Sequence, residues 1–202
     1  MDKHSKFIKM KKILLYITIF IGTFSCSSQK NISINFKLEN EESLNSYLTN
    51  NKVNVEKDDS YILKDFKSFA NFNNSDRLQI PEILFFNSQG YLVKNRFNNN
   101  ECTQVINDIE KINSLEFDKN VKIQDWFDNI KPLYNGLKNN NEYYVIINWA
   151  IYVDKINKQS FSWYNELKKS TSKSKVNCIL LNLDVMENWN LNDKQKKALN
   201  IK

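Results

Sequence analysis

The sequence predicts an α/β fold, in which helices flank a β-sheet, and two observations support this prediction. The first is a run of apolar residues over 143–149, followed by an amphipathic stretch over 158–168 and a second apolar run over 176–183. A strand, a helix and a strand in that order predict two parallel strands joined by a crossover helix.

The second observation is a hairpin pattern over residues 78–97. Pro81 has no backbone N–H to donate to a sheet, so we expect it to open the strand over 83–86 rather than to lie inside it. Gly90 supplies the positive φ of the turn, and residues 91–97 return as the antiparallel partner. The two patterns together predict one mixed sheet or two smaller ones.

The remaining elements follow from the spacing of apolar residues. About 175 residues remain after the first 25, which suits one domain or two small ones. Pro132 is expected to start a shorter piece within the helix in which it lies, and Asn192 to cap the last helix. The predicted helices span 41–48, 65–72, 101–112, 123–137 and 193–199, and the predicted strands span 33–38 and 52–55.

Residues 1–25 have the composition of an export signal. Five lysines precede an apolar run over 13–24. A basic start followed by a short apolar segment and a small residue is typical of a secretory signal. The run has about a dozen residues, whereas a membrane-spanning helix needs about 20. We therefore expect residues 1–25 to be removed as a signal peptide.

The stretch Thr23-Phe24-Ser25-Cys26 resembles a bacterial lipobox. The resemblance implies that Cys26 receives a diacylglycerol, becomes the first residue after cleavage and carries further acyl chains such as palmitate. Two or more acyl chains anchor a protein stably to a membrane. Residues 26–31 would form a polar tether, and we expect the protein on the periplasmic side of the outer membrane. An ordinary signal with a cysteine there by chance is the alternative.

Composition excludes several classes of function. Removing residues 1–25, with five lysines and one aspartate, lowers the formal net charge from +6 to +2, so nothing points to nucleic-acid binding. The only histidine, His4, lies in the signal, which excludes Ser-His-Asp and Cys-His catalysis and zinc sites with histidine ligands. Gly90 and Gly136 are too few for a phosphate-binding loop or a dinucleotide fingerprint.

Two further cysteines, Cys102 and Cys178, remain outside the lipid anchor. Cys178 lies in an apolar run and reads as a buried strand residue, and buried thiols are usually inert. Cys102 lies at a predicted helix start, where the helix dipole lowers the pKa of a thiol. Two unpaired thiols, a bridge between them and a reactive Cys102 all stay open.

Three segments together resemble the thioredoxin superfamily. Val145-Ile146-Ile147-Asn148-Trp149-Ala150 resembles the strand that ends at the active site, and Leu181-Asn182-Leu183-Asp184 resembles the end of the next parallel strand. Ile80-Pro81 through Gly90 resembles the cis-proline hairpin. The hairpin comes first here, which implies either one sheet in permuted chain order or two degenerate units over 32–117 and 122–202. An open apolar sheet edge would aggregate, so we favour the shared sheet.

The resemblance also shows where this chain departs from the family. Aligning Trp149-Ala150 places Val153 and Ile156 at the positions of the two reactive cysteines. Dithiol exchange needs a thiolate and a resolving thiol, which these side chains do not have. The sequence therefore excludes a disulfide reductase or isomerase at this site, and it predicts no cofactor.

A non-catalytic role in binding a protein or peptide of the cell envelope, or as a scaffold, is the favoured hypothesis. The family's cis-proline face binds extended peptides by backbone pairing. The resemblance thereby makes Ile80, Pro81, Tyr152 and Ile156 the candidate binding residues.

Two alternatives belong to other classes. Thiol-disulfide or redox-sensing activity would use the lone Cys102. A hydrolase would use the carboxylates Asp154 and Asp184, which lie near predicted strand ends, where the sites of α/β proteins gather. Asp184 can equally well cap the following turn.

We expect Cys26→Ser to abolish the incorporation of an alkyne-tagged palmitate during growth, because the acyl chains have no other attachment point. The variant should also leave the membrane fraction. Cys178→Ser is the matched control and should keep both properties. Undiminished labelling of the Cys26 variant would contradict lipidation at this residue.

Overall fold

Seven strands pair in one mixed sheet in the computed structural model, which describes residues 36–94, 112–134, 143–169 and 176–201. These residues belong to one unit, Ile34–Lys202. The strands are Leu38–Glu39 (β1), Ser60–Leu63 (β2), Glu82–Phe86 (β3), Tyr91–Val93 (β4), Phe117–Lys122 (β5), Ile130–Pro132 (β6), Tyr143–Trp149 (β7), Val176–Asn182 (β8) and Val185–Met186 (β9). The helices of more than three residues are Glu41–Asn50 (α2), Phe66–Asn74 (α3), Gln124–Phe127 (α5), the 3-10 helix Ile151–Ile156 (η3), Asn157–Lys169 (α6) and Asp193–Ala198 (α7).

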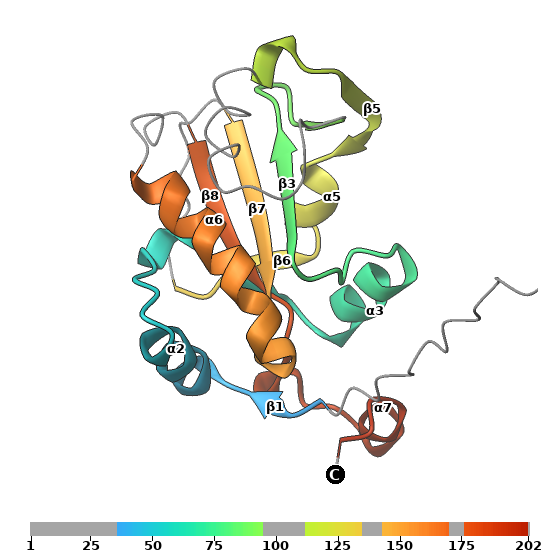
Figure 1. Cartoon of the computed structure of the whole chain (residues 1–202). Coiled ribbons are helices and arrows are strands. Elements are labelled where there is room, and N and C mark those ends of the chain that lie inside the picture. The colour runs from blue at the N-terminus through green and yellow to red at the C-terminus, as the bar shows by residue number, and fades with distance from the viewer. Residues whose placement is uncertain (1–35, 95–111, 135–142, 170–175, 202) are drawn as a thin grey trace, which may run out of the picture. The chain divides into compact units, whose positions relative to one another are not determined.

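The centre of the sheet is the β7-α6-β8 unit (Figure 1). The order of strands is β5-β4-β3-β7-β8-β2-β6, and β7 pairs in parallel with β8, which pairs in parallel with β2. The predicted parallel crossover over residues 143–183 is therefore confirmed. The α/β class is confirmed with it.

The predicted hairpin occupies the adjacent position. Strand β3 pairs antiparallel with β7, with Glu82 opposite Asn148, and with β4 on its other side. Gly90 adopts a φ of 78°, which a residue with a Cβ rarely tolerates. The side-chain oxygen of Asn87 accepts hydrogen bonds from the backbone N–H groups of Gln89 and Tyr91, which closes the turn.

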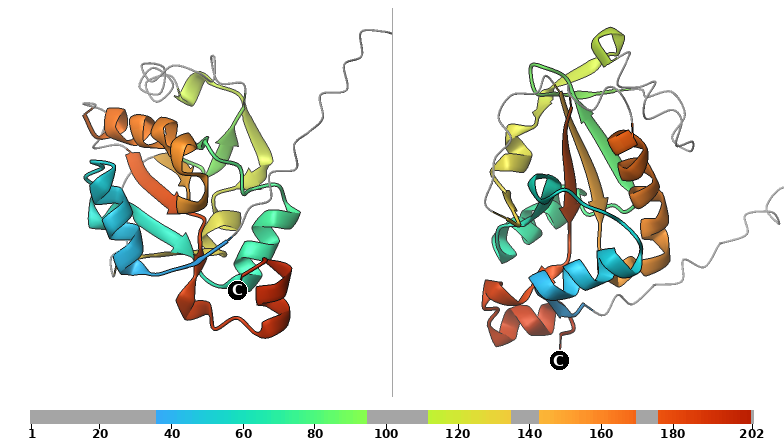
Figure 2. Two further views of the ribbon diagram at one scale, coloured as in Figure 1. Left: turned by 60° about the horizontal axis from the view of Figure 1, so that its bottom comes forward. Right: turned by 90° about the vertical axis from the view of Figure 1, so that its left-hand side faces the viewer.

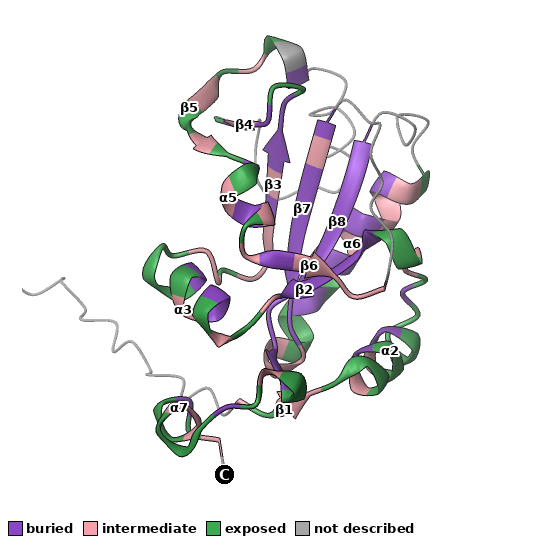
Figure 3. Cartoon of the chain, turned by 180° about the vertical axis from the view of Figure 1, so that it is seen from behind, coloured by how far each residue is buried: buried purple, intermediate pink, exposed green. Residues whose placement is uncertain are grey.

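Side chains of the central strands alternate between two apolar clusters, one on each face of the sheet. Val145, Ile147 and Trp149 of β7 pack with α2 and α6, whereas Ile146 packs with α3 and α5 on the other face. Figure 2 shows α6 on one side of the sheet and α3 and α5 on the other. Figure 3 shows that β7 and β8 are buried along nearly their whole length. A strand buried on both faces explains the continuous apolar runs in the sequence.

Side-chain caps fix where the helices begin. Asn40 and Ser43 form a reciprocal capping box at α2, and Asn192 forms one with Gln195 at α7. The side chain of Asp65 accepts a hydrogen bond from the backbone N–H of Ser68 at the start of α3. The predicted helices over 41–48, 65–72 and 193–199 are confirmed.

Other predicted elements are wrong. The described part of the predicted helix over 123–137, residues 123–134, forms no long helix: α5 ends at Phe127, and Pro132 ends the edge strand β6. Residues 52–55 form no strand. Residues 33–35 of the predicted strand over 33–38 lie outside the described residues, and of the rest only Leu38 belongs to a strand, β1, which pairs with β9. Strands β2 and β5 were not predicted. The predicted helix over 101–112 lies almost wholly outside the described residues.

The sheet draws strands from both of the stretches that the resemblance suggested. Strands β2, β3 and β4 come from residues 32–117, and β6, β7 and β8 come from residues 122–202. Strand β5 lies across the interval between the two stretches. All seven strands share one hydrogen-bonded sheet.

An ion pair joins the 3-10 helix Lys57–Asp59 (η1), which directly precedes β2, to the end of α6. The Lys168 ammonium lies 2.6 Å from Oδ2 of Asp59 and 2.8 Å from Oε2 of Glu56, and the Asp59 side chain is only 1% exposed. The Tyr164 hydroxyl also donates to Asp59, at 2.9 Å. Burial lowers the pKa of the Lys168 ammonium, but its hydrogen bonds to the two carboxylates outweigh this effect and raise the pKa overall.

We expect Lys168→Met to lower the free energy of unfolding by about 3 kcal/mol, because it leaves the buried Asp59 carboxylate without its cation. Lys169→Met is the matched control. The Lys169 side chain is 73% exposed and lies 3.5 Å from Glu166, so its loss should cost less than about 0.5 kcal/mol. Urea unfolding of both variants measures the difference. Equal losses would show that the buried pair contributes no more than a surface pair.

Candidate functional site

Ligand-binding and catalytic sites of open parallel sheets typically lie at the carboxyl ends of the strands, which here are the ends of β7 and β8. The turn after β7 is η3, and it holds the two positions at which the resemblance would place cysteines. Val153 is half-buried against the cluster on the α3 face, and Ile156 is 47% exposed. Both side chains are hydrocarbon, so this turn has no group for thiol exchange.

Hydrogen bonds within the chain close the turn. The side-chain amide of Asn157 donates to the carbonyl of Ala150 at 2.7 Å and accepts from its N–H at 3.2 Å. The same amide donates to the Tyr47 hydroxyl at 2.9 Å, and that hydroxyl donates to Oδ1 of Asp154 at 3.0 Å. Asp154 has a φ of 31°, a conformation that costs about 1–3 kcal/mol and needs such surrounding contacts to persist. Burial, and the neighbouring Asp154 carboxylate with it, raises the pKa of Tyr47.

Asp184 fastens the same turn to the end of β8. Its Oδ2 accepts hydrogen bonds from the backbone N–H of Ile151 at 2.8 Å and from the side-chain amide of Asn182 at 2.6 Å. The Asp184 side chain is buried, and this burial raises the pKa of its carboxyl group to about 6. Burial also raises the pKa of the Tyr152 hydroxyl, and the nearby Asp184 carboxylate adds to this effect. The carboxyl group therefore acts as a structural acceptor within the fold.

Asn148 ties the segment before Pro81 to β7. Its side-chain amide donates to the carbonyl of Gln79 at 3.2 Å and to Oε2 of Glu82 at 3.0 Å. Its backbone carbonyl accepts from the Ser160 hydroxyl at 2.7 Å. Strand β7, the segment that leads into β3 and helix α6 are thus linked at one buried residue.

The four candidate binding residues lie around this strand end, but they do not form one exposed patch. The Ile80–Pro81 bond is cis. Ile80 and Tyr152 both pack against the cluster on the α3 face, and the Tyr152 ring contacts the Phe36 ring with centroids 4.9 Å apart. Pro81 lines a groove on the α6 side, and Ile156 stands exposed.

The groove beside Pro81 has a volume of about 290 Å³. Gln159 and Trp163 of α6, Leu92 of β4 and Gln79 are among the residues that line it. The lining combines two aromatic residues, aliphatic side chains, two amides and the acidic residue Glu82. Such a groove suits a side chain of moderate size with a polar group near its base.

The remaining sequence hypotheses concern carboxylates and thiols. Asp154 and Asp184 have different partners, Tyr47 for the first and Ile151 with Asn182 for the second. Cys102 lies outside the described residues, and Cys178 is buried in β8. In the described part of the chain no group of three or more acidic, histidine or cysteine side chains is placed to hold a metal ion.

Sequence reasoning missed the polar residues that close the turn. Tyr47 comes from α2, more than a hundred positions away, and nothing in the sequence links it to Asn157. Asn148 and Asn182 were read only as part of the apolar strands that contain them. A signal was present, because a polar residue inside a run of buried apolar residues needs a specific partner.

Comparisons with protein-family models, with curated proteins and with solved structures found no match to this chain. Among the residues that the structure describes, none of the helices has the length and apolar character needed to cross a membrane.

The raised pKa of Asp184 predicts a pH dependence of stability. Between about pH 4 and pH 6 the unfolded chain loses this proton while the folded protein keeps it, so the free energy of unfolding falls as the pH rises. Two pKa units correspond to a fall of about 3 kcal/mol, and the contribution is constant above pH 7.

The measurement is the free energy of unfolding from pH 4 to pH 7 for the wild type and for Asp184→Asn. The difference between the two should change by about 3 kcal/mol over this range. Asp193→Asn, an exposed aspartate, is the control and should follow the wild type. Parallel curves for the wild type and Asp184→Asn would show that this carboxyl group is not buried in the way described.

Proposed function

We propose that the mature chain is a lipid-anchored protein of the bacterial cell envelope with a thioredoxin-like fold and without catalytic activity. In this proposal it binds an extended segment of another envelope protein beside Pro81. Cys26 is the anchor, and residues 26–31 are the tether.

The arrangement of strands supports the thioredoxin-like part of the proposal. The strand that ends in Trp149-Ala150 is followed by a helix and a parallel strand that ends before Asp184, as the resemblance implies. The hairpin that follows Pro81 pairs antiparallel with the same strand. The permuted order of these segments along the chain is compatible with one shared sheet.

The single observation that carries the non-catalytic part is the closed turn between β7 and α6. Val153 and Ile156 offer no nucleophile or proton donor there. The buried amide of Asn157 and the carboxyl group of Asp184 are both engaged by backbone groups of the turn. A general acid or base must be able to reach a substrate proton, and these groups are already used within the fold.

The binding part rests on the segment before β3. Among the described residues, no hydrogen bond uses the backbone N–H or carbonyl of Ile80. Backbone groups of this kind can pair with an extended peptide, and a pocket alongside then selects a side chain. In this proposal the groove lined by Pro81 and Trp163 is that pocket.

We expect a photoreactive benzoylphenylalanine at Gln79, which is exposed and lines the groove, to form a defined crosslink in the native envelope. The same group at Lys67, exposed on α3, should not give this adduct. Immunoblotting of the irradiated full-length lipoprotein measures both.

Blocking the groove provides the decisive comparison. Gln159→Trp fills it from α6 and should reduce the Gln79 adduct at least about fivefold, corresponding to about 1 kcal/mol. Lys158→Trp places the same ring one position away on an exposed site outside the groove and should leave the adduct intact. An adduct that survives Gln159→Trp, or no adduct at Gln79, would refute binding at this groove.

A further inference from the structure

The described chain enters the fold at the same end as the turn η3. Phe36 lies two positions before β1, and its ring contacts the Tyr152 ring of η3 with centroids 4.9 Å apart. Figure 1 shows β1 and α7 together at this end of the molecule. The residue to which the N-terminal segment connects is therefore packed directly on the turn.

Ile156, the last residue of η3, has its side chain at the surface. It is 47% exposed, and no other large apolar side chain among the described residues is exposed to this degree. Tyr152 and Phe36 are half-buried at the same end. The hydrogen bonds of Tyr47 and Asn157 fix the turn, so Ile156 stays at the surface. An exposed apolar side chain near half-buried aromatic rings is typical of a surface that contacts a membrane or another protein.

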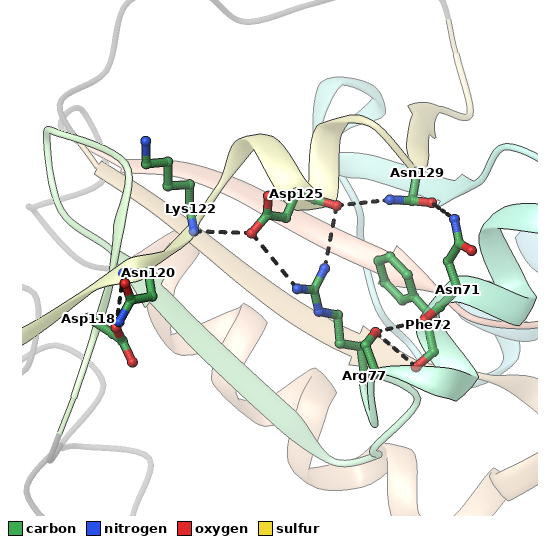
Figure 4. A network of polar contacts seen from close by, with 9 residues as sticks. Asn71, Phe72, Arg77, Asp118, Asn120, Lys122, Asp125 and Asn129 are labelled. Atoms are coloured by element: carbon green, nitrogen blue, oxygen red, sulfur yellow. Dashed lines mark hydrogen bonds and ion pairs between the residues drawn. The ribbon is translucent and has the colours of Figure 1, made fainter.

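Helix α3 extends this surface, and a polar network joins it to α5 (Figure 4). The Phe69 ring of α3 contacts the Phe36 ring with centroids 5.7 Å apart. Asn71 of α3 donates to Asn129 at 3.0 Å, and the Arg77 guanidinium lies 3.8 Å from a carboxylate of α5. The surface around Phe36 is therefore formed before it contacts anything else.

Opposite charges occur together at this end, so they give little net attraction to an anionic surface. The neighbouring pairs include Lys37 with Glu39, Asp154 with Lys155, and Asp193 with Lys194. A contact here would therefore depend on apolar side chains, and salt would affect it little.

The length of the tether keeps this end close to the membrane, a step that rests on the proposed acyl anchor at Cys26. Ten peptide units join Cys26 to Phe36. Even fully extended they span at most about 35 Å. Anchoring also makes any second contact with the membrane intramolecular, so a small apolar contact is favoured by its high effective concentration.

We propose that the η3 end of the domain lies on the phospholipid surface in which the acyl chains of Cys26 are anchored. Ile156 enters the boundary between headgroups and acyl chains, and the rings of Tyr152 and Phe36 lie at headgroup level, where aromatic side chains are favoured. The inference goes beyond the anchor itself, because a tether limits distance but sets no orientation.

The full-length lipoprotein in phosphatidylcholine vesicles tests this orientation. In a Cys102→Ser background, in which Cys178 is buried, Lys155→Cys carries a nitrobenzoxadiazole fluorophore next to Ile156. We expect lipids with a nitroxide close to the headgroup to quench most of its fluorescence. The same label at Gln89→Cys, exposed in the turn at the opposite end of the sheet, should not be quenched.

Variants of Ile156 show what holds the label at the membrane. Ile156→Ser should lower the ratio of docked to undocked protein about fivefold, the effect of losing about half of a buried isoleucine side chain, and Ile156→Leu should preserve it. A label at position 155 that stays in water, equal quenching at both positions, or no effect of Ile156→Ser would overturn the orientation alone. Mass spectrometry that finds no acyl chain on Cys26 would refute the anchor, and the orientation with it.

Discussion

The structure depends on satisfying the polar groups buried at the carboxyl ends of β7 and β8. Burying an amide or a carboxyl group is unfavourable unless it is hydrogen-bonded, and Asn148, Asn157, Asn182 and Asp184 are all buried there. Asn148 donates to the segment before β3, and Asn157 of α6 donates to the carbonyl of Ala150 at the end of β7. Asp184, which accepts from Asn182 at the end of β8, also accepts from Ile151 of η3. These partners set how β3, α6 and β8 meet β7. The polar residues therefore specify the arrangement that the apolar core stabilises.

The same constraint explains why the strand ends do not look like an active site. Catalytic groups are typically polar side chains left available at a strand end, whereas here such side chains are taken up by the fold itself. The backbone N–H of Ala150 donates a hydrogen bond to the side chain of Asn157, and the backbone N–H of Ile151 donates one to the carboxyl group of Asp184. Hydrocarbon side chains at positions 153 and 156 then complete the turn. Among the described residues, a groove beside Pro81 on the α6 face and a cavity lined by Tyr61 and Tyr144 on the other face are open to a ligand.

The sequence predicted the central elements well because burial on both faces leaves a clear pattern. Strand β7 was predicted with its observed bounds, and α6 and β8 to within one residue at each end. Prediction failed toward the edges of the sheet, where tertiary contacts decide the structure. Strand β5, Phe117–Lys122, carries charged and polar residues without a clear alternation of apolar and polar positions. The spacing of apolar residues around Trp126 suggested a long helix, but α5 is short and an edge strand soon follows it. The sequence pointed to the turn after β7, but Tyr47, which helps to close that turn, is brought in by α2 and has no local signal.

The edges of the sheet bear on how another chain could bind. Unpaired edge strands invite pairing with a second chain, and lysine or proline on an edge opposes it. Strand β5 carries Lys119 and Lys122 on one edge, and the three-residue β6 on the other carries Lys131 and ends at Pro132. Neither edge is suited to extend the sheet. The proposed partner would instead pair with the backbone groups of Ile80, in the segment just before β3, and place one of its side chains in the groove beside Pro81.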